Sequence, residues 1–190
     1  GADAVKIGML GSPKIASAVA DRLEGLSIPI VFDPVMIATS GSVLADAGTI
    51  AAFEPLMKLA TLVTPNIPEL AALTGETTGT LEEIAHAAAL LSQRFGGAVL
   101  AKGGHADGSR IHDVLIDPRT RAASFDDERI DTRHTHGTGC TLSSAIATLL
   151  GHGQPLEHSV RLARQFVRKA LLTAPGFGAG HGPMGHQAVR

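Results

Sequence analysis

The strongest constraint on the fold of this chain is an alternation of short apolar runs with longer segments of helical periodicity. The runs at Ile28–Phe32, Leu62–Val63 and Ala98–Ala101 have the uninterrupted hydrophobicity of strands that are covered on both faces. Helical patterns separate them, which favours parallel strands joined by crossover helices. We therefore expect an α/β fold with a mostly parallel central sheet and helices on both faces.

Weaker patterns complete the expected order of elements. A strand is expected at Val5–Leu10. The helix after it is expected to bury Ile15, Val19 and Leu23, which recur every four residues. Two apolar segments that flank Asp117–Thr120 predict a β-hairpin. Further helices are expected at about 49–59, from Pro68, at 81–95, after Cys140 and at about 156–170, with a loop at 36–48 and an irregular tail at 175–190.

Composition limits the class of protein. The chain has 190 residues, 44% of them hydrophobic and 18% charged, which favours one folded domain over residues 1–190. A net charge of −2 without Trp or Tyr argues against nucleic-acid binding. No run approaches the length of a membrane span, and the single cysteine excludes an internal disulfide. We expect a cytoplasmic protein without nucleic-acid or membrane partners.

The stretch from Gly137 to Cys140 has the composition of an anion-binding loop. An amphipathic helical pattern follows it, so its backbone N–H groups are expected to lie in the first turn of a helix. Gly137 and Gly139 leave that backbone bare, and the helix dipole adds partial positive charge, a combination that binds phosphate. Cys140 lies where a thiolate is favoured. The stretch therefore predicts a phosphoryl-transfer site with a proton acceptor.

Polar residues follow the three apolar runs. Asp33, Asn66 and Lys102 come after the first, second and third run, and ligands of parallel sheets bind outside the carboxyl ends of the strands. Lys102 is suited to contact nucleotide phosphates as a point charge. Asp33 and Glu69 are suited to hold Mg²⁺ through water, because Mg²⁺ keeps part of its hydration shell. We expect these residues to meet the glycine loop at one edge of the sheet.

Each of these residues also has an interpretation without chemistry. Asn66 and Glu69 are three residues apart, so they share a helix face, and an acidic residue also stabilises a helix N-terminus. Lys102 is compatible with simple solvation at a strand end, and a free cysteine such as Cys140 often packs in a core. The histidines lack neighbours that would complete a tetrahedral zinc set, and no chemistry is assigned to them.

Five sequence blocks occur in an order that matches a known family. They are Asp33–Met36 with Ala38–Gly41, Thr64–Glu69, Lys102–His105, Thr135–Ala145 and Gly180–His186. Together they resemble the hydroxymethylpyrimidine/phosphomethylpyrimidine kinases of thiamine biosynthesis, members of the ribokinase-like superfamily. The resemblance implies a ribokinase-like three-layer sandwich, a homodimer, and ATP- and Mg²⁺-dependent phosphorylation of 4-amino-5-hydroxymethyl-2-methylpyrimidine and then of its monophosphate.

The resemblance also implies a role for each matching position. The loop Gly137–Cys140 would be the anion hole for the transferred phosphoryl group. Cys140 would be the proton acceptor, at the place where many sugar kinases of the superfamily have an aspartate. The remaining implied roles are catalysis by Gly137, Thr138 and Gly139, nucleotide binding by Lys102, Gly103, Asn66 and Thr138, pyrimidine binding by Met9, Val35 and Cys140, and Mg²⁺ binding by Asp33 and Glu69.

The chain departs from the family pattern before Val5. The family has a further strand and a Gly-rich substrate segment there, so we expect the N-terminal part of the kinase to be missing from these 190 residues. Three alternatives stay open: a pyridoxal kinase of the same fold, a hydroxyethylthiazole kinase, whose motif context fits less well, and a nucleotide-binding protein without turnover.

Overall fold

The fold is given by a computed structural model that describes residues 1–37, 41–105, 108–119 and 122–189. Two parts of the expected motifs lie outside the described residues. They are Ala38–Ser40, in the block after the first apolar run, and Thr120, in the turn of the expected hairpin.

A six-stranded sheet runs through the described part of the chain, with its strands in sequence order. The first four strands are parallel, and the last two are antiparallel to their neighbours. This confirms the expected mostly parallel sheet and places the carboxyl ends of four strands along one edge. The strands are β1 (Val5–Ile7), β2 (Ile30–Phe32), β3 (Leu62–Val63), β4 (Ala98–Ala101), β5 (Arg110–Ile116) and β6 (Ala123–Glu128).

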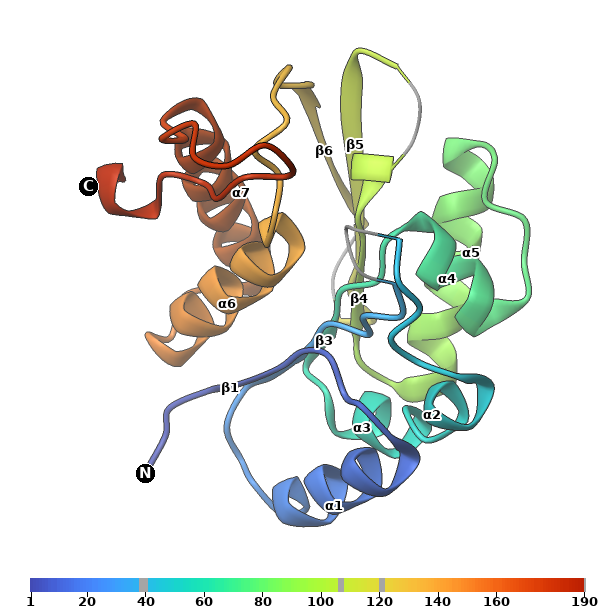
Figure 1. The fold of residues 1–190 in the computed structure, drawn as a ribbon. Helices are drawn as coiled ribbons and strands as arrows, with labels where there is room; N and C mark the ends of the chain where they lie inside the picture. The colour runs from blue at the N-terminus through green and yellow to red at the C-terminus, as the bar shows by residue number, and fades with distance from the viewer. Residues whose placement is uncertain (38–40, 106–107, 120–121, 190) are drawn as a thin grey trace.

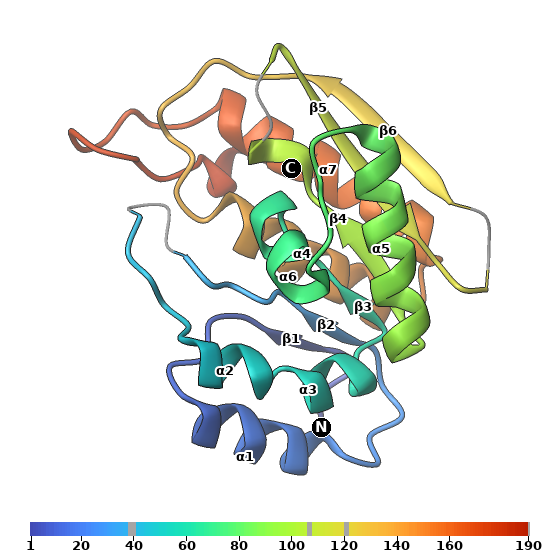
Figure 2. The same cartoon turned by 90° about the vertical axis from the view of Figure 1, so that its right-hand side faces the viewer.

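Helices cover both faces of the sheet, which confirms the three-layer sandwich (Figure 1). Figure 2 shows α1 to α5 in front of the sheet and α6 and α7 behind it. One group consists of α1 (Pro13–Leu23), α2 (Ala47–Ala51), α3 (Glu54–Leu59), α4 (Ile67–Thr74) and α5 (Leu81–Phe95); the other consists of α6 (Thr138–Gly151) and α7 (Leu156–Leu172), and short 3-10 turns lie at η1 (Gly103–His105) and η2 (His186–Ala188).

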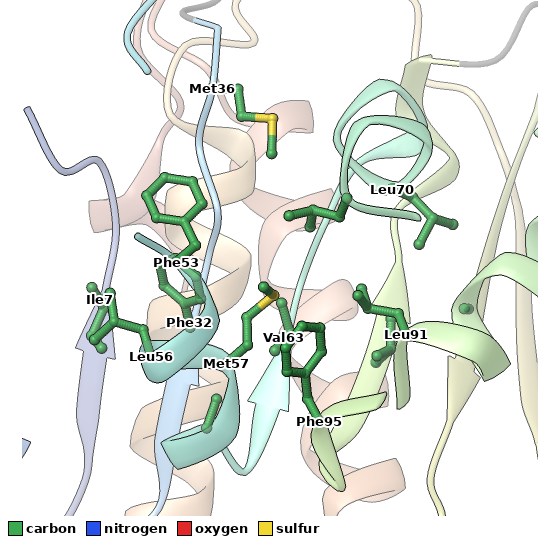
Figure 3. Packing of buried hydrophobic residues seen from close by; sticks show 14 of the residues in the cluster. Ile7, Phe32, Met36, Phe53, Leu56, Met57, Val63, Leu70, Leu91 and Phe95 are labelled. Carbon is green, nitrogen blue, oxygen red and sulfur yellow. The ribbon is translucent and has the colours of Figure 1, made fainter. Parts of the chain in front are cut away.

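The core lies in two layers because successive strand residues point to opposite faces. Phe32 belongs to the layer under α1 to α5, and its neighbour Val31 belongs to the layer under α6 and α7. In the first layer Phe32 meets Phe53 edge to face, with 5.2 Å between the ring centroids (Figure 3). In the second layer Ile146 and Val160 are fully buried. Burial on both faces explains why β2 to β4 read as uninterrupted apolar runs.

The helix expected at 49–59 is two helices, so this prediction was wrong. The chain forms α2 and then α3, with Phe53 as the N-cap residue of α3 and Pro55 at its start. Proline lacks an N–H group and restricts the residue before it, so a new helix begins where the sequence pattern suggested continuity.

The expected apolar face of α1 is also only partly correct. Leu23 is buried, but Ile15 is 49% exposed and Val19 is half-buried. Ala16 and Ala20 face the core instead. Because both are small, α1 approaches the sheet closely without the bulky contacts that the sequence pattern favoured.

The remaining differences concern length. The hairpin of β5 and β6 is longer than the two apolar segments that predicted it, the loop at 36–48 contains an antiparallel bridge between Ile37 and Val43, and the tail contains η2. Among the described residues, none of the helices combines the length and the hydropathy that crossing a membrane requires.

Candidate active site

Three strand ends meet at the carboxyl edge of the sheet. Asp33 follows β2 directly and Lys102 follows β4 directly, while Asn66 lies three residues after β3. An isolated parallel bridge pairs Asn66 with Lys102, and the Lys102 N–H donates to the carbonyl of Pro65 at 2.9 Å. The three polar residues that the sequence singled out therefore lie at neighbouring positions of one edge.

Asp33 is the centre of a buried hydrogen-bond network. Its side chain is 1% exposed, and its Oδ1 accepts hydrogen bonds from Lys102 Nζ at 2.6 Å and from Thr64 Oγ1 at 3.1 Å. Its Oδ2 accepts a hydrogen bond from Ser143 Oγ at 3.3 Å. A buried carboxylate is tolerated only when such donors replace the water that it has lost. Asp33 therefore holds the ammonium group of Lys102 in one place.

The N-terminus of α6 faces this ion pair. Gly137 is the N-cap residue with φ of 80°, a left-handed conformation that favours glycine, and no side chain of the described residues caps the helix there. A Cβ atom on Gly139 would lie 3.3 Å from Lys102 Nζ and 3.9 Å from Asp33 Oδ2. The bare backbone of the first turn, with its partial positive charge, thus adjoins a fixed cation. The first turn of α6 and the ammonium group of Lys102 together form a site for an anion.

The side chains of Thr138 and Cys140 belong to the same turn but differ in their surroundings. The Thr138 hydroxyl donates to the carbonyl of Thr135 at 2.6 Å, so it stabilises the loop itself. Cys140 is exposed, and its thiol is therefore not a core packing group. An exposed thiol in the first turn is accessible to a bound substrate, and its role as a proton acceptor remains a prediction.

Glu69 and Asn66 form a capping box at the start of α4. The Asn66 side chain accepts a hydrogen bond from the Glu69 N–H at 2.9 Å, and Glu69 Oε2 accepts one from the Asn66 N–H at 2.7 Å. Glu69 Oε1 also accepts one from the Met36 N–H at 3.4 Å. Burial raises the pKa of Glu69, although Lys102 opposes this, and the nearby charge of Asp33 contributes to the rise. Capping is thus an established part of what both residues do.

The residues expected to contact a pyrimidine lie outside the two best-formed cavities. Met9 is 55% exposed, and Val35 is half-buried after β2. A cavity of about 340 Å³ lies between β1 and α6, and one of about 240 Å³ lies at the start of α1; neither is lined by Met9, Val35 or Cys140. The anion site is therefore the better-defined half of the candidate active site.

Sequence reasoning missed the buried groups behind the site. Ser143 and Thr64 orient Asp33, yet both read as ordinary residues of a helix and a strand end. The only sequence signal was that they lie inside the recognised motif blocks.

A second buried link reaches the site from α7. The Gly103 N–H donates to Asp113 Oδ1 at 2.7 Å, and the other oxygen of Asp113 pairs with Arg164. Burial, and secondarily the charge of Arg168, lower the pKa of Arg164 to about 10. The N–H of Gly103 is occupied by this bond, so a nucleotide contact predicted for Gly103 would use its other atoms.

The fit of Mg²⁺ to Asp33 and Glu69 follows from their hydrogen bonds. All four carboxylate oxygens already accept a hydrogen bond from the protein. The described residues contain no group of three or more His, Cys, Asp or Glu placed to hold a metal ion. Because these bonds occupy part of each carboxylate and both side chains are almost fully buried, we expect any Mg²⁺ at this edge to be held through the water shell that it usually keeps.

Comparisons with known sequences give one consistent family. A model of the family described as phosphomethylpyrimidine kinase matches residues 1–185. The hydroxymethylpyrimidine/phosphomethylpyrimidine kinase of Rhizobium meliloti is 41% identical over 187 residues, which cover 96% of this chain and 70% of that protein. The thiamine biosynthesis bifunctional protein ThiED of Geobacter sulfurreducens is 41% identical over 186 residues, which cover 97% of this chain but 38% of that protein.

Solved structures give the same fold. The ADP complex of Bacillus subtilis pyridoxal kinase superimposes with a TM-score of 0.88 at 29% identity, covering 100% of this chain and 71% of that one. The phosphomethylpyrimidine kinase of Clostridium difficile superimposes with a TM-score of 0.76 at 32% identity, covering 88% of this chain and 68% of that one.

Proposed function

The chain belongs to the phosphomethylpyrimidine kinase family, and on that premise we propose that it uses ATP to phosphorylate 4-amino-5-hydroxymethyl-2-methylpyrimidine and then the resulting monophosphate in thiamine biosynthesis. The supporting observation is the placement of Lys102 Nζ, bound to Asp33 and directly beside Gly139 in the first turn of α6. Phosphoryl transfer depends mainly on positioning and charge neutralisation, which a fixed ammonium and a helix N-terminus provide.

In the proposed reaction, the N–H groups of Gly139 and Cys140 and the ammonium of Lys102 bind the γ-phosphoryl oxygens of ATP. The Cys140 thiolate takes the proton of the substrate hydroxyl, the alcohol oxygen attacks phosphorus, and ADP leaves with the bridging electron pair. Asn66 and Thr138 lie beside the nucleotide, and Met9 and Val35 beside the pyrimidine. Mg²⁺, held through water near Asp33 and Glu69, would supply further positive charge to the phosphates.

In the direct test, the protein expressed from its gene is incubated with ATP, Mg²⁺ and the hydroxymethylpyrimidine. Mass spectrometry of the product should show the gain of one phosphoryl group and then of a second. ATP binding without any product would contradict the kinase and favour a nucleotide-binding protein without turnover.

Pyridoxal kinase is the second candidate, because pyridoxal kinase structures superimpose on this chain at TM-scores of 0.87 to 0.88. Parallel assays with pyridoxal and with the pyrimidine separate the two. The identity of 41% to a pyrimidine kinase, against 29% to the pyridoxal kinases, supports faster turnover of the pyrimidine. A higher kcat/KM for pyridoxal would reverse this assignment.

We extend the proposal to the state of the protein. Residues 1–190 belong to one kinase domain, the protein acts in the cytoplasm, where ATP is available and Cys140 stays reduced, and it assembles as a homodimer. Light scattering of the purified protein at working concentration gives the mass that tests the dimer.

A further inference from the structure

The segment after α7 turns back and lies along the loop that precedes α6 (Figure 1). His136 and Pro183 form a parallel bridge, and the His136 N–H donates to the carbonyl of Gly182 at 3.3 Å. Two residues after His136 and one residue after Pro183, the Thr138 hydroxyl lies 3.7 Å from the sulfur of Met184, which is 2% exposed. Contacts between the two segments therefore continue from the bridge into the first turn of α6.

The last of these contacts joins His186 to Thr141. A ring nitrogen of His186, Nε2, lies 2.9 Å from the Thr141 hydroxyl. The His186 ring also lies near Phe166 of α7, with the ring centroids 6.4 Å apart and the rings tilted by 43°. His186 thus lies between α6 and α7 and is held by both.

The tail is closely fitted to the loop. Gly182 is buried, and a Cβ atom there would clash with the ring of His134 and lie 2.5 Å from the carbonyl of Phe177. The Gly185 N–H also donates to the carbonyl of Ala170 at 2.8 Å, which ties the tail to α7. A segment with so little free space transmits the position of α7 to the loop that it covers.

Thr141 is the residue through which this fit reaches the anion site. Its N–H donates to the carbonyl of Gly137 at 2.8 Å, which closes the first turn of α6 around Gly139 and Cys140. No side chain of the described residues caps this turn, and Gly137 adds backbone freedom. A site that binds a phosphoryl group must hold its donors to a fraction of an ångström.

We propose that His186 is a positioning residue: by holding Thr141, it fixes the first turn of α6 so that its N–H groups point at the transferred phosphoryl group. This rests on the proposed kinase function. His186 does not touch the reacting atoms, so its effect is on the turnover of bound substrate more than on substrate affinity.

The test uses the protein expressed from its gene, with His186→Ala, His186→Gln, Thr141→Val and the double variant His186→Ala/Thr141→Val. His186→Ala should lower kcat roughly 3- to 10-fold, the effect of one hydrogen bond, with little change in KM for the pyrimidine. His186→Gln should restore most of kcat, because its amide also bonds a hydroxyl. The double variant should lose no more than the worse single variant, because both remove the same contact.

Amide hydrogen exchange separates this proposal from the kinase assignment. In His186→Ala, the exchange rate of the peptide covering 136–142 should rise by about the same factor as kcat falls, while the melting temperature stays close to that of the wild type. His158→Ala, an exposed histidine of α7, is the matched control and should change neither quantity. Wild-type exchange and wild-type kcat in His186→Ala, or additive losses in the double variant, would overturn the proposal. An inactive wild type would instead refute the kinase, while exchange still tests the positioning role.

Discussion

Replacing Ser143 by alanine tests whether the Asp33 network supports the site. The Ser143 hydroxyl lies within hydrogen-bond distance of Asp33 Oδ2 at 3.3 Å and of the carbonyls of Gly139 and Cys140 at 3.0 and 3.1 Å. It has one proton, which the charged carboxylate attracts most strongly. The substitution leaves Oδ2 of a carboxylate that is 1% exposed without this donor.

The chain contains a matched control. Ser159 of α7 is also fully buried, and its hydroxyl donates to the carbonyl of Pro155 at 3.0 Å, the same spacing of four residues as from Ser143 to Gly139. Alanine at either position gains the same helix propensity, and in both variants the carbonyl four residues earlier loses its contact with the hydroxyl; the Ser159 hydroxyl also lies 3.4 Å from the carbonyl of Gln154. The main difference between the two variants is therefore the bond from Ser143 to the charged Asp33.

A hydrogen bond to a charged group contributes about 1.5–3 kcal/mol, and the 3.3 Å distance places this one at the lower end. Ser143→Ala should therefore lose about 1.5 kcal/mol more free energy of unfolding than Ser159→Ala. For a chain of this size that corresponds to a melting temperature lower by about 3–6 °C. A displaced Asp33 also releases Lys102, so kcat/KM should fall about tenfold in Ser143→Ala and stay near wild type in Ser159→Ala.

Thermal denaturation followed by circular dichroism and steady-state kinase assays measure both quantities. Equal melting temperatures of the two variants, together with unchanged kcat/KM in Ser143→Ala, would refute the proposed dependence of Lys102 on the Asp33 network.

Three further predictions address single atoms of the site. Gly139→Ala should leave the melting temperature unchanged or raise it, since alanine is favoured in helices by about 1 kcal/mol, while its Cβ crowds Lys102 and lowers kcat/KM; Gly11→Ala, where the Cβ meets open space, is the control, and equal kinetics of the two variants would contradict the crowding. Glu69→Gln keeps an acceptor for the cap but cannot ionise. Because the pKa of Glu69 is raised in the folded protein, Glu69 makes the wild type lose stability as pH rises through and above the ordinary value of 4.5, so the melting temperature of the variant relative to the wild type should increase from pH 4 to pH 7. A difference in melting temperature that does not depend on pH would exclude the buried charge. Cys140→Ala should slow the first phosphorylation by about 10²–10⁴-fold and the second step less, because a phosphate nucleophile is already ionised; equal losses, measured with each substrate separately, would count against the proton acceptor.

Local patterns predicted the elements that build the carboxyl edge, but not what holds them together. Asp33 and Lys102 were found because each directly follows an apolar run, and Gly139 because glycine before a helix is a local signal. Ser143 was missed because its partner Asp33 is 110 positions away, and a buried serine on a helix has no periodic signature. Pro55 shows the reverse case, where a local signal was present and the apolar pattern outweighed it.

The tail was the least predictable part. Its glycines, prolines and histidines show no hydrophobic period, so nothing in the sequence indicated that Met184 is buried or that His186 reaches Thr141. Such contacts depend on where α7 ends in space, and a one-dimensional pattern does not contain that information.

The long separation between Asp33 and Ser143 has a consequence for synthesis of the protein. A growing chain that has reached residue 105 already contains Asp33, Asn66 and Lys102, yet it lacks both Ser143 and the turn at Gly139. A chain that ends before α6 therefore lacks the anion site that the first turn of α6 forms with Lys102. The anion site is complete only after α6 has been synthesised and has packed against the sheet.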